Sequence, residues 1–340
     1  MSLQKETILD LIKNQFGNTS VKQMQLTISK ILNLSQATVY NKLVGRNDFS
    51  LVEFLEISKE LGISIDSFLA NQKMSKEKPL MFFSDGLEKN PDSFFEYFVK
   101  VFENVEKANP FSVKTKATFI CLQPHVFHMM RYPYLLYLKM FTYNLINWKM
   151  PSMSAYDPLS FMNDEKTQKL IKKLYNAYQS IPLTEMVGHN FVHPICSQLD
   201  YLVKSRIIKD KEQLRQIKFD LYGLLDDLEK TASRGFRVNA EGDETPVEMY
   251  INKFIHVSNI ILIETDEGGF FTIQSDVPDV LKTYDSGYIK HFKQWLDSNK
   301  EYTLNISKTG GLERNDFFDR NKQHIDMVMT NLENHFKQYN

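Results

Sequence analysis

The chain has 340 residues, of which 42% are hydrophobic and 24% charged, and its formal net charge is −1. These are values of an ordinary globular protein with room for about two domains, and they exclude a polycation that binds nucleic acid over its whole surface. Two cysteines exclude a disulfide-stabilised scaffold. The N-terminal residues lack a signal-peptide pattern, and the most apolar stretch, residues 132–148, has Lys139 in its middle. We therefore expect a cytoplasmic protein with no membrane partner.

Short helical patterns follow one another in the first 70 residues, each with its own start or stop signal. Ser35 is expected to cap the third helix and Gly45 to end it. Residues 50–53, Ser-Leu-Val-Glu, have the pattern of a capping box at the start of the fourth helix. Ser64 is expected to cap a short fifth helix. The predicted helices cover residues 7–16, 21–32, 36–44, 51–61 and 65–70.

The stretch from Leu11 to Asn47 contains basic residues but no acidic residue. Because 42 of the 340 residues are acidic, a stretch of this length would be expected to carry between four and five acids. Phosphate backbones attract such a local positive field, whereas local carboxylates would repel them. The alternative interpretation is a chance gap in the distribution of acids. The basic residues are Lys13, Lys22, Lys30, Lys42 and Arg46.

Residues 21–44 have the spacing of a helix-turn-helix, in which two short helices are joined by a tight turn. Asn33 suits a left-handed turn conformation. The second helix of such a motif presents small or hydrogen-bonding side chains to DNA bases from its N-terminal part; Gln and Asn can bind adenine, and an alanine methyl can contact thymine. Inward positions hold Ile28, Leu32, Leu34, Val39 and Leu43, and outward positions hold Gln36, Ala37, Thr38, Tyr40 and Asn41.

Residues 25–69 resemble the lambda-repressor-like (Cro-type) helix-turn-helix domain. The matching elements are Gln25, Ile28-Ser29, Asn33-Leu34-Ser35, Ala37-Thr38-Val39, Gly45 and Leu61-Gly62-Ile63-Ser64-Ile65-Asp66. The resemblance implies a five-helix bundle that binds DNA, in which Gln36 and Ala37 read bases while Gln25 and Arg46 lie near the DNA backbone. The family usually has glycine where Asn33 stands, and its core residue at the position of Lys42. Here the apolar residue is shifted by one, so we expect Lys42 to face solvent and to contact a phosphate.

Each predicted DNA contact has a plain structural alternative. Gln36 and Thr38 could be polar residues of a first helical turn, Tyr40 could pack at the edge of the bundle, and Asn41 could be an ordinary surface residue. The whole motif could also serve contact with a protein. The predicted DNA-binding residues are Gln25, Gln36, Ala37, Thr38, Tyr40, Asn41, Lys42 and Arg46.

A polar segment that ends in proline separates this region from the rest of the chain. We expect a DNA-binding domain over residues 1–72, a linker over 73–79, and a sensing or dimerisation domain over 80–340, with a sub-boundary considered near 235–250. Two β-rich runs within residues 256–275 flank Asp-Glu-Gly-Gly, which predicts a β-hairpin. Further helices are predicted at residues 91–108, 132–148, 163–179, 184–204, 211–231, 284–298 and 313–338, and a strand at 302–307.

The fold class expected from these patterns is mostly α. A five-helix lambda-repressor-like domain would be followed by a large, mainly helical α+β domain with one β-hairpin. The dense aromatic residues of that second domain, including SFFEYFVKVF at residues 93–102, are explained by helical core packing. They single out no residue of a ligand pocket.

Two segments of the second domain concentrate both cysteines and four of the eight histidines. If the segments met in space, thiolate and imidazole groups could bind Zn²⁺. The spacings match no standard zinc signature, however, and buried cysteine commonly packs as a small apolar side chain. We therefore expect neither a metal site nor another cofactor. The residues concerned are Cys121, His125, His128, His189, His193 and Cys196.

These patterns together predict a sequence-specific DNA-binding transcriptional regulator. We expect double-stranded DNA as its partner, and a homodimer formed through residues 80–340, which would also sense a small-molecule or protein effector. The sequence contains no nucleophile elbow, dinucleotide fingerprint or phosphate-binding loop, so no enzyme and no catalytic residue is expected. Two alternatives remain open: a metal- or ligand-dependent enzyme or sensor in residues 80–340 with an accessory helix-turn-helix, and a phage-repressor-like or antitoxin-like protein.

Overall fold

The chain divides into two compact units, Met1–Met81 and Phe82–Asn340, which we call unit 1 and unit 2. The computed structural model describes residues 8, 9, 12, 13, 16, 20–61, 83–84, 116–147, 156–253, 259–265, 268–274 and 280–339. The predicted helices at 65–70 and 91–108 and the predicted linker at 73–79 lie outside these residues. Among the described residues, none of the helices combines the length and the apolar character needed to cross a membrane.

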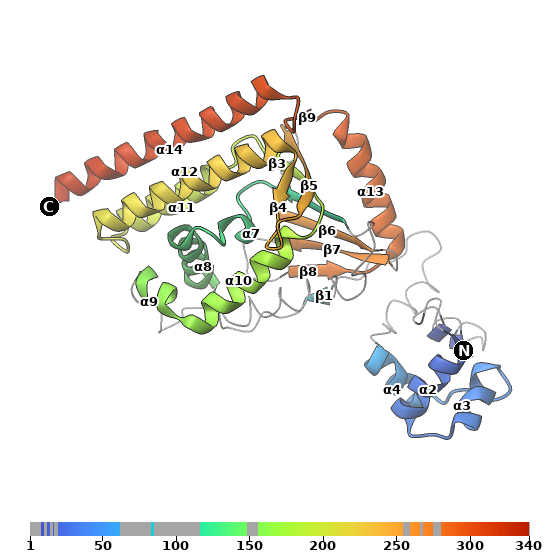
Figure 1. The fold of residues 1–340 in the computed structure, drawn as a ribbon. Coiled ribbons are helices and arrows are strands. Elements are labelled where there is room, and N and C mark those ends of the chain that lie inside the picture. The colour runs from blue at the N-terminus through green and yellow to red at the C-terminus, as the bar shows by residue number, and fades with distance from the viewer. Residues whose placement is uncertain are drawn as a thin grey trace, which may run out of the picture. The chain divides into compact units, whose positions relative to one another are not determined.

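Unit 1 contains α2 (Val21–Leu32), α3 (Gln36–Leu43) and α4 (Leu51–Leu61), preceded by helical residues between positions 8 and 16 (Figure 1). The apolar faces of these helices meet in one core, in which Ile12, Ile28, Val39, Phe54 and Ile57 are almost completely buried. The inward face predicted for α2 and α3 is therefore confirmed. The five-helix bundle stays a prediction, because the fifth helix is not among the described elements.

The turn between α2 and α3 follows the local signals of the sequence. Asn33 adopts the left-handed conformation with φ 50°, and its backbone N–H donates to the carbonyl of Ser29. The Ser35 hydroxyl accepts a hydrogen bond from the Thr38 backbone N–H at 3.2 Å, as expected of an N-cap. Gly45 has φ 78° just beyond the end of α3. The turn between α2 and α3 and the end of α3 are thus encoded by residues at those positions.

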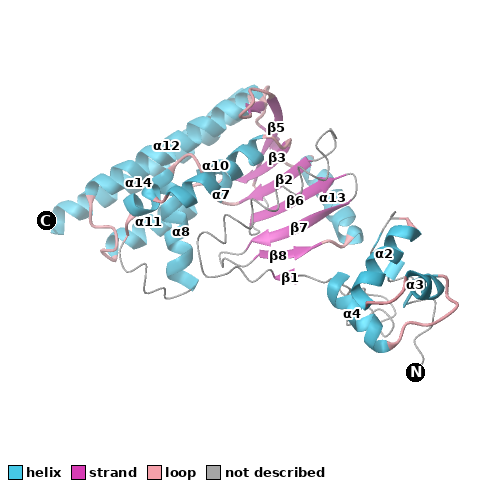
Figure 2. Ribbon diagram, turned by 60° about the horizontal axis from the view of Figure 1, so that its bottom comes forward, coloured by secondary structure: helices cyan, strands magenta, loops and turns pink. Residues whose placement is uncertain are grey.

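Unit 2 is built on a mixed sheet with the strand order β1-β8-β7-β6-β2-β3-β5-β4, and β9 also pairs with β5 (Figure 2). The pairs β2–β3 and β3–β5 are parallel and all other pairs are antiparallel. The strands are β1 (Phe83–Ser84), β2 (Lys116–Cys121), β3 (Leu183–Gly188), β4 (Phe236–Val238), β5 (Glu244–Asn252), β6 (Asn259–Thr265), β7 (Gly268–Gln274), β8 (Val280–Thr283) and β9 (Leu304–Asn305).

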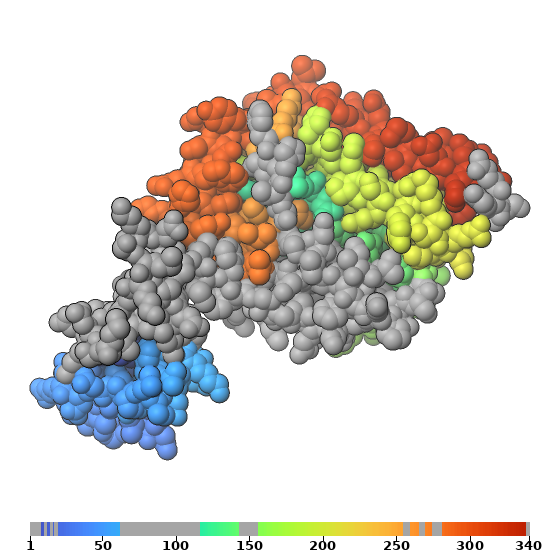
Figure 3. Space-filling model, turned by 180° about the vertical axis from the view of Figure 1, so that it is seen from behind, coloured from blue at the N-terminus to red at the C-terminus, as the bar shows by residue number. Residues whose placement is uncertain are grey.

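Helices cover both faces of this sheet unequally. On one face, Phe292 and Leu296 of α13 pack on Ile120, Met186 and Leu262. The other face carries the larger core, which includes Phe119, Leu183 and Val187 and is closed by the remaining helices. Those helices are α7 (Val126–Met129), α8 (Pro133–Asn147), α9 (Pro158–Asn163), α10 (Glu165–Gln179), α11 (His193–Lys204), α12 (Lys211–Arg234) and α14 (Gly311–Tyr339); α13 spans Ser286–Lys300. The surfaces of α11, α12 and α14 adjoin at one end of unit 2 (Figure 3).

Some predictions for this region are confirmed. Strands β6 and β7 form the predicted hairpin, with Thr265 paired to Gly268 across the turn. Helices α8, α10, α12, α13 and α14 lie within a few residues of their predicted positions, and β9 falls within the predicted strand at residues 302–307. The local periodicity of long amphipathic helices was therefore sufficient to locate them.

The expected α+β class is confirmed in part: helices make up most of the described part of unit 2, but its strands form one large mixed sheet instead of a single hairpin. The predicted helix at 184–204 is instead strand β3 followed by α11. β2 and β3 pair on both edges and are buried on both faces, so neither shows the alternation that marks a half-exposed strand. The segment near 235–250, considered as a sub-boundary, contributes β4 and β5 to the sheet.

Arg237 anchors the short strand β4 to the C-terminal end of α10. Its guanidinium donates to three backbone carbonyls, those of Tyr178, Gln179 (3.3 Å) and Ile181 (2.7 Å). It also lies over the Tyr178 ring, 4.0 Å from the ring centroid. The Arg237 residue is only 8% exposed, so these hydrogen bonds replace most of its hydration.

We expect Arg237→Met to lower the free energy of unfolding of unit 2 by about 2–4 kcal/mol, because three backbone carbonyls lose the charged donor that Arg237 supplies. Arg237→Lys keeps the charge but loses the planar guanidinium. Its free energy of unfolding should therefore lie between those of Arg237→Met and the wild type. Both tryptophans, Trp148 and Trp295, belong to unit 2, so tryptophan fluorescence during urea denaturation reports its unfolding. A change below about 0.5 kcal/mol, the range of ordinary surface substitutions, would contradict this role.

Candidate functional site

The face of α3 that points away from the unit 1 core is polar. Gln36, Ala37 and Tyr40 are exposed, and Tyr40 retains 43% of its accessible surface. Val39 and Leu43, on the opposite face, are buried in the core with residues of α2. The packing of α3 therefore leaves three of the predicted DNA-binding side chains free to meet a ligand.

Two of the predicted DNA-binding residues have structural partners within the motif. The Gln25 side-chain amide donates to the backbone carbonyl of Gln36 at 2.8 Å, which ties the first turn of α3 to α2. The Thr38 hydroxyl lies 2.8 Å from that of Ser35, within the N-cap of α3. Both residues help to orient α3, whether or not they also contact DNA.

Lys42 does not face solvent as predicted. Its side chain is 12% exposed, and its ammonium donates to the Asp48 carbonyl at 2.6 Å and to a Glu53 carboxylate oxygen at 3.0 Å. The ammonium also lies 5.5 Å from the centroid of the Phe49 ring. The chain reverses after Gly45 and brings the start of α4 against the end of α3, so this cation is already neutralised within unit 1.

The remaining cations of the acid-free stretch are available to an anion. Lys13, Lys22, Lys30 and Arg46 are exposed, and none of the described carboxylates forms an ion pair with them. Arg46, which follows the end of α3, donates a long hydrogen bond of 3.4 Å to the side-chain oxygen of Asn41 in the last turn of that helix. Asn41 is half-buried, which restricts the reach of its amide.

The predicted capping box at the start of α4 is confirmed, and it includes the partner of Lys42. The Ser50 N–H donates to Glu53 Oε2 at 2.6 Å, and the Glu53 N–H donates to the Ser50 hydroxyl at 3.2 Å. Burial alone would raise the pKa of Glu53, but the hydrogen bonds from the Ser50 N–H and the Lys42 ammonium outweigh it and lower the pKa. The Glu53 carboxylate therefore joins α4 to the end of α3.

The six cysteine and histidine residues of the second domain find separate surroundings. His128 bonds to Glu185, the His189 ring bonds to Arg320, and the His193 ring stacks on His324 with 3.5 Å between centroids. Among the described residues, no group of three or more His, Cys, Asp or Glu side chains is arranged to hold a metal ion.

The other three of these residues are buried in apolar surroundings. The His125 ring stacks on Phe127 with 4.5 Å between centroids. Burial, with a smaller effect of the Glu185 charge, raises the pKa of the Cys121 thiol. Burial also raises the pKa of Cys196 to about 12. Burial therefore favours the neutral thiol at both positions.

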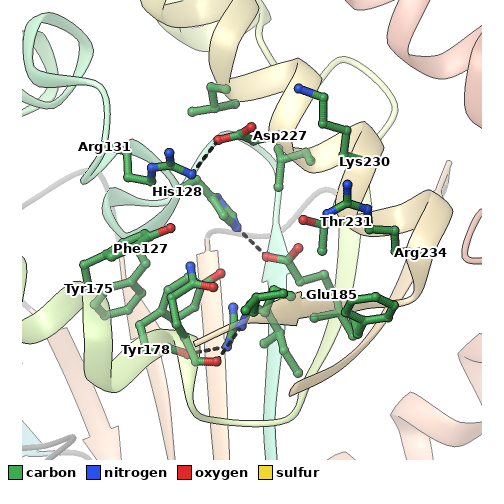
Figure 4. Close-up of a pocket in the computed structure, with 18 of the residues that line it drawn as sticks. Phe127, His128, Arg131, Tyr175, Tyr178, Glu185, Asp227, Lys230, Thr231 and Arg234 are labelled. Atoms are coloured by element: carbon green, nitrogen blue, oxygen red, sulfur yellow. Dashed lines mark hydrogen bonds and ion pairs between the residues drawn. The ribbon is translucent and has the colours of Figure 1, made fainter. Parts of the chain in front are cut away.

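A cavity of about 230 Å³ opens in unit 2 where α7, α10, α12 and the strands β3 and β4 meet (Figure 4). It lies on the face of the sheet that carries the larger core. Aromatic side chains form one wall, polar side chains of α12 form the opposite wall, and a histidine–glutamate pair lies between them. The aromatic wall comprises Phe127, Tyr175 and Tyr178; the α12 wall includes Asp227, Lys230, Thr231 and Arg234.

The pair in this cavity consists of His128 and Glu185, of which Glu185 is 1% exposed. His128 Nδ1 accepts a hydrogen bond from the His125 backbone N–H at 2.9 Å, so that nitrogen carries no proton. Its proton is then on Nε2, where it is donated to Glu185 Oε1. The geometry therefore assigns a neutral imidazole and a negatively charged, deeply buried carboxylate.

The charges around the cavity do not cancel. Arg237, whose hydrogen bonds all go to neutral carbonyls, balances the Glu185 carboxylate. Arg131 forms an ion pair with Asp227 at 3.1 Å. Two exposed cations of α12, Lys230 and Arg234, remain without an ion-pair partner among the described residues. The cavity as a whole is positive.

Asp227 also organises the phenol beside it. The Tyr132 hydroxyl lies 2.5 Å from Asp227 Oδ2 and 2.7 Å from the Gly223 carbonyl. Burial, followed by the hydrogen bond to Asp227, raises the pKa of Tyr132 well above its ordinary value. Burial, with the Glu185 charge, does the same for Tyr178. Both phenols are therefore neutral hydrogen-bonding groups at the cavity wall.

Sequence patterns did not single out Glu185, Arg237 or the cavity. The signal they left is a charged residue inside a short apolar run, as in Leu-Thr-Glu-Met-Val and Phe-Arg-Val. Charged residues are seldom fully buried unless they are paired, so such a residue in a strand indicates a buried partner. The signal is informative only in a strand, and the sequence pattern predicts a helix where β3 lies.

We expect Glu53→Gln to speed hydrogen exchange of the first α4 amides about fivefold at neutral pH, the effect of roughly 1 kcal/mol when the carboxylate at the start of α4 loses its charge and its ion pair with Lys42. Because the pKa of Glu53 is lowered, its contribution is complete above the ordinary carboxyl value of 4.5 and is lost as pH falls through the lowered value. The stability difference between variant and wild type should therefore disappear in acid. Glu56→Gln, an exposed glutamate one turn further along α4, is the matched control and should exchange like the wild type.

None of the family models compared with this chain matches it, and neither a curated protein nor a solved structure matches it either.

Proposed function

We propose that the protein is a sequence-specific DNA-binding transcriptional regulator whose α3 lies in the major groove. The observation that carries the proposal is the exposed face of α3, the second helix of the proposed helix-turn-helix, on which Gln36, Ala37 and Tyr40 are directed to solvent. A recognition helix reads base edges from this end. The resemblance of residues 25–69 to Cro-type domains is consistent with this role.

Local charge supports the same surface. Lys22, Lys30 and Arg46 are exposed, and residues 11–47 contain no acid that would repel a phosphate. The packing within unit 1 also reduces the number of side chains that we assign to contacts with DNA bases. Lys42 belongs to the pair with Glu53, and Gln25 is held by the Gln36 carbonyl, so Gln36 and Tyr40 are the side chains we assign to direct base readout.

We expect Gln36→Ala to lower affinity for the preferred DNA sequence roughly 5- to 150-fold, because one bidentate contact with a base contributes about 1–3 kcal/mol of discrimination. The measurement is selection from a random duplex pool at two salt concentrations, followed by titration of the enriched sequence. Gln23→Ala removes the same side chain from an exposed position of α2 and is the matched control.

An enriched motif that Gln36→Ala loses or changes, with Gln23→Ala unaffected, would support base readout by α3. Weak binding that depends steeply on salt and enriches no motif would show only attraction between cations and phosphates. The proposal of sequence-specific regulation would then fail.

A single helix-turn-helix contacts few phosphates, so specific binding by such modules usually needs two half-sites about one helical turn apart. We propose that residues 80–340 form a homodimer, which brings a second recognition helix to the DNA. An effector bound to unit 2 would then change the spacing of the two recognition helices.

The expected particle has twice the chain mass of 39.9 kDa, both free and on DNA, and the selected motif has a two-fold repeat. Size-exclusion chromatography with light scattering measures the mass. A monomer in both states, together with a motif lacking a dyad, would rule out the dimer while leaving base readout by α3 to be judged by the first experiment.

A further inference from the structure

We propose that the cavity between α7, α10 and α12 binds a small zwitterion. The protonated amine of such a molecule would meet Glu185 at the floor, and its carboxylate or phosphate would meet Lys230 and Arg234 at the rim. The site belongs to unit 2 alone, so the proposal does not depend on DNA binding.

The Glu185 carboxylate at the floor of the cavity can accept hydrogen bonds from N–H groups of a ligand. Only one oxygen of Glu185 is used, by His128, and no other hydrogen bond from the described residues reaches the carboxylate. His128 cannot supply a second proton, because its Nδ1 accepts from the His125 N–H. A buried carboxylate that lines a cavity is best satisfied by a cationic donor, since a charge-assisted hydrogen bond is the strongest available there.

The aromatic wall suits the same end of the ligand. Tyr178 and Phe127 stack with 5.3 Å between ring centroids, and Tyr178 lies directly beside the pair. Neutral aromatic faces attract a cation that has left water. The Tyr178 ring already has the Arg237 guanidinium 4.0 Å from its centroid, so the attraction for an ammonium group comes mainly from the Glu185 carboxylate, and the aromatic wall keeps water away from that contact.

The rim of the cavity, in contrast, would attract an anionic group of the ligand. Lys230 and Arg234 are four residues apart on α12, and their side chains lie on the same wall of the cavity as Thr231 (Figure 4). Asp227, the acid of this wall, is already paired with Arg131. A carboxylate or phosphate at the rim would therefore meet two cations and a hydroxyl without displacing an existing ion pair.

The size of the cavity limits the ligand. Pockets for drug-sized molecules enclose about 300–1,000 Å³, whereas this cavity encloses about 230 Å³. A free amino acid or a phosphorylated amine fits this class better than a nucleotide or a peptide. Both share the same two charged ends, so the experiment must separate them.

The test is isothermal titration calorimetry of the full-length protein with each standard α-amino acid and with O-phosphoethanolamine. Probes that carry one charged end only, namely ethanolamine, acetate and inorganic phosphate, are titrated beside them. We expect saturable binding of at least one zwitterion, and binding at least tenfold weaker for every single-ended probe. Whether an amino acid or the phosphorylated amine binds identifies the anionic group.

Two variants test the two ends of the site. Glu185→Gln keeps an oxygen to accept from His128 but removes the charge, and Lys230→Ala/Arg234→Ala removes the rim cations. Each should weaken the zwitterion roughly 10- to 100-fold, the effect of losing a hydrogen bond to a charged group. Lys211→Ala/Arg215→Ala removes the same two charges from the other end of α12 and should bind like the wild type.

Tryptophan fluorescence during denaturation shows whether Glu185→Gln folds; if it does not, the rim variant and the single-ended probes decide. Absence of binding by every zwitterion would overturn the proposal. So would single-ended anions that bind as tightly as zwitterions, or affinity unchanged in either folded variant, because one end of the ligand would then have no partner in this cavity.

Discussion

The buried charge of Glu185 is the constraint on which the interior of unit 2 depends. A carboxylate taken out of water is costly unless cations and donors surround it. Here a histidine from α7 donates to it and an arginine from β4 lies across Tyr178, so three segments far apart in the sequence must converge at β3. The cavity opens where these segments converge, and Glu185, His128, Tyr178 and Arg237 all line it.

Much of unit 1 could be predicted from its sequence because its signals are local. The left-handed Asn33, the cap at Ser35 and the capping box at Ser50–Glu53 each involve residues within a few positions of one another. Lys42 could not be placed in the same way. Its partner lies on the next helix, and the direction in which the chain returns after Gly45 decides whether that side chain is exposed or paired.

Unit 2 contains both elements that local sequence signals predict and elements that they do not. Long helices with one apolar face, such as α12, were located from periodicity alone, and the β6–β7 hairpin from its turn. The central strands β2 and β3 were missed because both of their faces are buried, so their sequences lack the alternation of a surface strand. Without β3 there was no reason to see Glu185 as buried, and the two histidines nearby suggested a metal instead of a hydrogen-bonding partner.

The order of strands in the sheet also determines when unit 2 can form as the chain emerges from a ribosome. β2 pairs with β3 on one side and with β6 on the other. Both edges of residues 116–121 can therefore be paired only after the residues of β6 have been synthesised. The larger core is completed later still, because Phe318, Ile325 and Leu332 of α14 belong to it. Unit 1, whose contacts are short-range, has no such delay. During synthesis the core formed by α2, α3 and α4 can therefore assemble while the apolar strands of unit 2 are still unpaired, which is the interval in which chaperones would be needed.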